Sequence, residues 1–131
     1  SKTYGTLTRS GSGTQGLTIT GTNTFASIVD NLGLVAHTIT FPNVTTTVGY
    51  FRVAGVAGKL VTLARTGAAG VFTLTTTSGS INIACNFISV SNSTVDAAPL
   101  WYAGSSSTDG GGNTNWIFAD NQKLRKQFSL L

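Results

Sequence analysis

The chain has 131 residues, the length of a single domain with one hydrophobic core. Charged residues make up 9% of it, and its four acidic residues are all Asp, so it holds little material for acid–base catalysis or a carboxylate metal site. Its eight Lys and Arg are too thinly spread for a phosphate-binding face, which disfavours nucleic acid as a partner. We therefore expect a protein that is not an enzyme and needs no cofactor.

The first segment, residues 1–16, is polar and rich in Gly and Ser. Such a segment buries too little apolar surface to offset its own ordering entropy. We predict an N-terminal arm that becomes ordered on a partner, with Lys2, Tyr4 and Arg9 as candidate partner-binding residues.

Short segments in which Thr alternates with apolar residues follow along residues 17–118, the expected core domain. Thr is β-branched and favours extended chain, so this pattern predicts an all-β fold. The alternation is strictest from Ile81 to Phe87, where we expect Cys85 to be a buried thiol and not a nucleophile. The predicted strands lie around residues 17–19, 25–28, 37–41, 48–53, 60–65, 71–77 and 81–87.

A weak internal repeat separates Ile19, Phe41 and Leu63 by 22 residues each. Such a period is about one coil of a parallel β-helix, in which short strands stack and inward side chains form ladders. The sequence therefore favours a short parallel β-helix-like solenoid whose open ends are capped or hidden by association. The alternative is a jelly-roll or β-sandwich, in which short strands also recur every 8 to 12 residues or so.

Few groups suggest chemistry. His37 with Asp30 and one of the many Ser residues could form a catalytic triad, but no G-x-S-x-G motif is present and we disfavour that interpretation. The glycine-rich run after Asp109 lacks the acidic positions of an EF-hand, so we expect a flexible loop and no metal site. No stretch of about 18 apolar residues exists, so we expect no membrane span.

Residues 86–118 resemble a terminal β-rich module that recurs in virion proteins of tailed phages and in surface proteins of aquatic bacteria. The likeness extends upstream over about three-quarters of the chain, and it implies a β-helical or β-rich module without a catalytic centre. The chain departs from the pattern at Pro99-Leu100, in having almost nothing upstream and in extending beyond residue 118. The matching segments are ISVSNS (88–93), WYAG (101–104), DGGGN (109–113) and WIF (116–118).

The aromatic residues concentrate in this module and allow two interpretations. They could cap the end of the β stack by covering its apolar rungs, which we favour. Alternatively, Trp101 and Tyr102 could form a surface recognition patch on which a glycan stacks. The residues concerned are Trp101, Tyr102, Trp116 and Phe118.

The last segment, residues 119–131, combines cations with apolar residues. It either folds back on the core as a short strand or docks onto a neighbouring subunit or shell. In the docking case the cations would meet acidic groups and the apolar residues would anchor the contact. The candidate partner-binding residues of this tail are Lys123, Arg125, Lys126, Phe128 and Leu131.

A short chain with one such module and two polar or basic ends resembles a phage capsid decoration (cement) protein. We therefore expect a structural virion protein, a homotrimer that binds the major capsid protein on the capsid surface after synthesis in the host cytoplasm. Ser1 fits a chain whose initiator Met has been removed, and no secretory signal is evident. The alternative is a receptor- or glycan-binding module of a phage fibre or surface adhesin.

Overall fold

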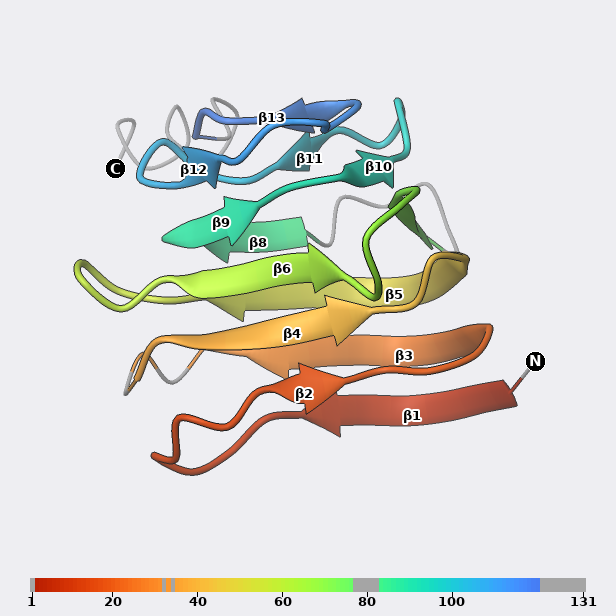
Figure 1. Cartoon of the computed structure of the whole chain (residues 1–131), viewed down its shortest axis with the longest axis horizontal. Coiled ribbons are helices and arrows are strands. Elements are labelled where there is room, and N and C mark those ends of the chain that lie inside the picture. The colour runs from red at the N-terminus through yellow and green to blue at the C-terminus, as the bar shows by residue number, and fades with distance from the viewer. Residues whose placement is uncertain (1, 32, 34, 77–82, 121–131) are drawn as a thin grey trace, which may run out of the picture.

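The computed structural model describes residues 2–31, 33, 35–76 and 83–120. The regular structure in these residues is entirely β (Figure 1). The strands are β1 (Lys2–Thr8), β2 (Leu17–Thr18), β3 (Asn23–Asp30), β4 (His37–Phe41), β5 (Thr45–Ala54), β6 (Val61–Arg65), β7 (Phe72–Thr76), β8 (Ile83–Asn86), β9 (Ile88–Val90), β10 (Ser93–Val95), β11 (Trp101–Tyr102), β12 (Thr108–Asp109) and β13 (Trp116–Ile117).

The chain winds as a short parallel β-solenoid of about four turns. It alternates between two sheets, one with the order β1-β3-β5-β7-β10 and β8 also on β5, the other with the order β12-β9-β6-β4-β2. We call them the first and second sheets; β11 and β13 pair separately. All pairings between these strands are parallel, which confirms the predicted solenoid and excludes the antiparallel jelly-roll or sandwich.

The coils lengthen along the chain. In the second sheet, Leu17 pairs with Ile39, Ile39 with Leu63, and Leu63 with Val90, which are steps of 22, 24 and 27 residues. The predicted constant period of 22 is therefore wrong after the first coil, and Phe41 stands opposite Arg65. The extra residues lie in the turns, where they leave the stacking of the strands intact.

The long strands of the first sheet contain a break in alternation. In β3 the buried residues Phe25 and Ile28 are three apart, and in β5 so are Val48 and Phe51. The breaks lie in register, and the next coil divides its contribution at this point between β7 and β8. The first sheet thus has two halves, and β7 and β10 continue the half that contains the start of β5.

The predicted strand 81–87 is shorter than its pattern indicated. Residues 81 and 82 lie outside the described part of the chain, and β8 ends at Asn86. Phe87 has φ of 51°, a left-handed conformation that interrupts the strand and turns the chain into the second sheet. Period-two alternation continued through Phe87 in the sequence although the strand itself did not.

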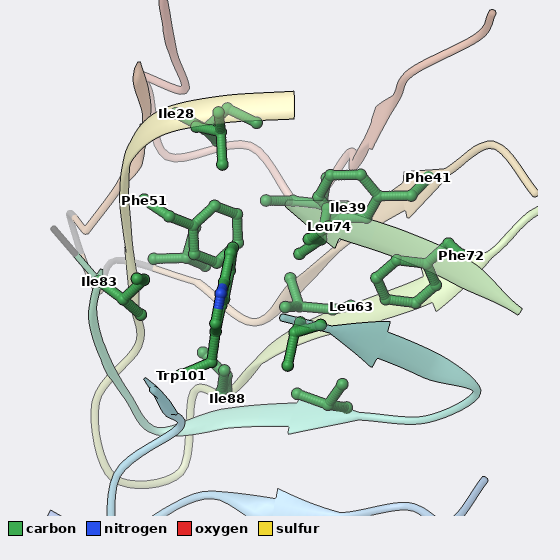
Figure 2. Packing of buried hydrophobic residues seen from close by; sticks show 14 of the residues in the cluster. Ile28, Ile39, Phe41, Phe51, Leu63, Phe72, Leu74, Ile83, Ile88 and Trp101 are labelled. Carbon is green, nitrogen blue, oxygen red and sulfur yellow. The ribbon is translucent and has the colours of Figure 1, made fainter. Parts of the chain in front are cut away.

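The core consists of ladders of inward side chains from successive coils (Figure 2). Phe41 and Phe72 stack with ring centroids 4.9 Å apart and an interplanar angle of 12°. Such an aromatic pair contributes about 0.5–1.5 kcal/mol beyond the area that it buries. Because each rung covers the next, stability comes from contacts between neighbouring coils.

The N-terminal segment is not a free arm along its whole length. Residues 2–8 form β1, which pairs in register with β3 from Lys2 to Thr8. Tyr4 and Leu7 stand at positions that match buried Phe25 and Ile28 of the next coil. The backbone hydrogen bonds and these two apolar side chains offset the ordering entropy that composition alone suggested was too large.

Candidate docking surface at the open end of the solenoid

The two ends of the solenoid differ. At the C-terminal end, Trp116 lies against Trp101 with ring centroids 5.4 Å apart and an interplanar angle of 75°. Trp116 Nε1 donates to Ser93 Oγ at 2.9 Å, and Phe118 packs partly buried against the core. These contacts support the interpretation that the aromatic residues cover the last rungs.

Trp101 is not available as a recognition residue, so that prediction is wrong. Its side chain is 0% exposed, and its ring lies 5.4 Å from that of Phe51 (Figure 2). The reason is alternation: β11 points one residue of the pair inward, and Trp101 is that residue. Tyr102 points the other way and is half-buried.

The N-terminal end has no such cover in the described part of the chain. There β1 pairs with β3 alone and β2 with β4 alone, so both sheets present an open edge at the same end of the molecule (Figure 1). Apart from Lys2, β1 carries no charged residue, and it has no proline. Unprotected edges of this kind pair readily with another strand.

A hollow of about 350 Å³ lies beside this edge. Tyr4, which is 46% exposed, stacks on Phe25 with ring centroids 5.3 Å apart and forms part of its wall. We call this surface the open end. It is lined by Tyr4, Thr6, Leu7, Thr18, Ile19, Thr20, Asn23 and Phe25.

The predicted N-terminal contacts separate into two kinds. Lys2 and Tyr4 are exposed on β1 at the open end. Arg9 is 7% exposed, and its guanidinium donates to the carbonyl oxygens of Gly11, Gly13 and Gln15. The prediction for Arg9 is therefore wrong, because the side chain is used internally to hold the loop between β1 and β2.

Sequence reasoning missed the other half of this surface. Leu7 and Ile19 were read as ordinary strand residues, yet they belong to the first coil and have no preceding rung to cover them. The signal was present, since the first apolar positions of a solenoid without a cap must face outward along its axis.

The tail residues Lys123, Arg125, Lys126, Phe128 and Leu131 lie outside the described residues, and their predicted role stays a prediction. The predicted boundary at residue 119 is close to the end of the described chain, where Asp120 still contacts the core domain. Asp120 accepts hydrogen bonds from the backbone N–H and the hydroxyl of Ser105, both at 3.0 Å.

His37 and Asp30 do meet, although no triad forms. His37 Nε2 lies 2.5 Å from Asp30 Oδ2, and His37 Nδ1 lies 2.9 Å from the carbonyl oxygen of Val35. Both side chains are buried. Because both ring nitrogens are occupied, neither is free to take a proton from a substrate, and the pair serves to tie the end of β3 to the start of β4.

The remaining reactive groups are equally confined. Burial raises the pKa of Cys85 to about 12, an effect that outweighs the opposite influence of its backbone hydrogen bond with Val53. Asp109 accepts from the Gly111 N–H at 2.9 Å and from Asn113 Nδ2 at 2.7 Å, so it closes its own loop. The described residues contain no cluster of three His, Cys, Asp or Glu side chains that could hold a metal ion.

Comparison with family models, with curated proteins and with solved structures finds no match for this chain. Among the described residues, no helix is long and apolar enough to cross a membrane. The geometry of the open end is therefore the basis for a functional argument.

Proposed function

We propose that this protein is a structural virion protein, a capsid decoration protein that binds and stabilises the shell of a phage. The observation that carries the proposal is the open end, where an unpaired strand edge and an uncovered apolar hollow lie together. A partner strand laid along β1 would complete the first sheet and bury Tyr4 and Leu7 at once.

The proposed partner is the major capsid protein, and the proposed assembly on the shell is a homotrimer on the capsid surface. Lys2 at the edge of β1 favours an acidic neighbour. A protein that binds the assembled lattice and not its free subunits adds its binding free energy to the lattice, which is how it would stabilise the shell.

The first test is the copy number of this chain relative to the shell protein in purified particles, measured by quantitative mass spectrometry. We expect about one copy per shell subunit or a fixed simple fraction of that. A few copies per particle, or none, would contradict decoration and favour the fibre or adhesin module.

The second test addresses the surface. Tyr4→Lys places a charge over the hollow and should abolish binding to undecorated shells in a co-sedimentation assay, while thermal unfolding changes little because the residue is at an exposed edge. The matched control is Leu100→Lys, since Leu100 is also about half exposed but lies away from the open end. Normal binding by Tyr4→Lys would show that another surface makes the contact.

One observation favours a second candidate, a glycan-binding module. The exposed ring of Tyr4 stands beside the hydroxyl-bearing residues Thr6, Thr18 and Thr20 in one hollow, a combination on which a sugar can stack and form hydrogen bonds. Glycan-array binding that Tyr4→Ala removes and Tyr102→Ala leaves unchanged would support this function over decoration.

A further inference from the structure

Threonines form two straight files on the outer side of the first sheet. The pairing places Thr3, Thr24, Thr47 and Thr75 in register as one file, and Thr45, Thr73, Thr94 and Thr114 as the other. In β5 and β7 the two files run side by side, because each strand contributes two Thr residues two positions apart. We call these eight residues the Thr array.

The spacing of the Thr array is set by the backbone. Neighbouring strands in a sheet lie about 4.8 Å apart, and alternate residues of one strand lie about 6.6 Å apart, so the array is a two-dimensional lattice. Thr is stiff at χ1, which holds the hydroxyl and methyl groups in a repeating orientation. A rigid lattice of this kind loses little conformational entropy when it binds.

The hydroxyls of the Thr array are directed to solvent. Within the described residues, Thr75 Oγ1 donates to Asp96 Oδ1 at 2.8 Å, and the other seven hydroxyls have no partner in the protein. The array contains no charged or aromatic residue, and Asp96 stands at its border. Neither a phosphate group nor a single sugar ring would find the cation or the aromatic platform that it needs here.

A neutral lattice of hydroxyl and methyl groups fits a partner that is itself a lattice of oxygen atoms. The two repeats of the array are close to distances between water oxygens on the surfaces of ice. Waters held by the hydroxyls across both files would occupy positions that continue into the crystal. We propose that the Thr array is an ice-binding surface, independent of the docking function of the open end.

The second sheet supplies an internal comparison. On its outer side Thr38, Thr62, Ser89 and Thr108 form one hydroxyl file in register. The adjacent file is interrupted, because Thr18 and Thr40 are followed by Ala64. That face therefore lacks the two-file lattice, and a substitution in it is a matched control.

The test uses the purified full chain and measures thermal hysteresis by nanolitre osmometry together with inhibition of ice recrystallisation. We expect the unchanged protein to separate freezing from melting temperature and to shape ice crystals. Thr47→Lys and Thr73→Lys place a long cation in the middle of each file and should remove most of both activities. Thr62→Lys, at an equivalent position in the second sheet, should keep them.

Circular dichroism of each variant establishes that the solenoid is folded before the ice measurements are compared. The proposal is overturned if the unchanged protein does no more to ice than an inert protein at the same mass concentration. It is also overturned if Thr62→Lys loses as much activity as Thr47→Lys, since binding would then not depend on the Thr array. Neither result bears on capsid binding, which is measured with shells.

Discussion

Replacement of Trp101 by Ala tests the difference between a core residue and a recognition residue. The Trp101 ring is completely buried and lies between Phe51 on one side and Trp116 on the other. Removing it deletes the contact that joins the last coil to the inner rungs and leaves a cavity that the surrounding strands can fill only in part.

The expected loss is about 3–5 kcal/mol, the range for truncation of a buried Trp or Phe. A domain of this size has a total stability of about 5–15 kcal/mol, so the variant should lose a third of it or more. At a few degrees per kcal/mol, the melting temperature should fall by about 10–20 °C.

The assay is urea and thermal unfolding followed by far-ultraviolet circular dichroism, because the substitution also removes a fluorescent probe. Tyr102→Ala is the control on the same strand, and it should cost far less since Tyr102 points away from the core. A loss below about 1 kcal/mol for Trp101→Ala, the size expected of a surface substitution, would refute the assignment of this residue to the core.

Three further substitutions or measurements test other parts of the solenoid. His37→Ala leaves the Asp30 carboxylate buried without its partner and should cost about 3–5 kcal/mol in urea unfolding, part of which the double variant with Asp30→Ala should recover. Gly16→Ala would place a Cβ 2.1 Å from the carbonyl oxygen of Thr38, and we expect a loss of about 1–3 kcal/mol by the same measurement. Because the pKa of Cys85 is about 12 in the folded protein against an ordinary 9.0, alkylation near pH 8 should be about 1,000-fold slower than in urea, and stability should decline from about pH 9 towards 12 as the unfolded thiol ionises first. Equal alkylation rates in the folded and unfolded chain would contradict the burial of this thiol.

Alternation was the part of the sequence that predicted structure best. Ile19, Ile39 and Leu63 are buried as their pattern indicated, because successive side chains of a strand point to opposite faces. The spacing between such segments then separated a parallel stack from an antiparallel sandwich, since a solenoid repeats at the length of a coil and not at the length of a hairpin.

The same reasoning had no access to the corners. The breaks that put Phe25 and Ile28 three apart look like loss of pattern in the sequence, and their register across coils appears only when the strands are paired. Trp101 and Tyr102 are adjacent in a strand of two residues, so no period existed to say which points inward. Arg9 looked like a surface cation because its partners are backbone carbonyls that composition does not reveal.

The solenoid separates the residues that stabilise the fold from those that meet other molecules. Val48 is fully buried while its neighbour Thr47 stands on the outer face of the same strand, so a change at Thr47 leaves the ladder under it intact. Along the axis the situation is different, because the first coil must use the same apolar residues both to pack on the second coil and to face outward. A partner at the open end would therefore raise the stability of the first coil as it binds, and thermal unfolding of the complex should begin at a higher temperature than that of the free protein. Binding on the Thr array involves no core residue, and its contribution should depend on the surface lattice alone.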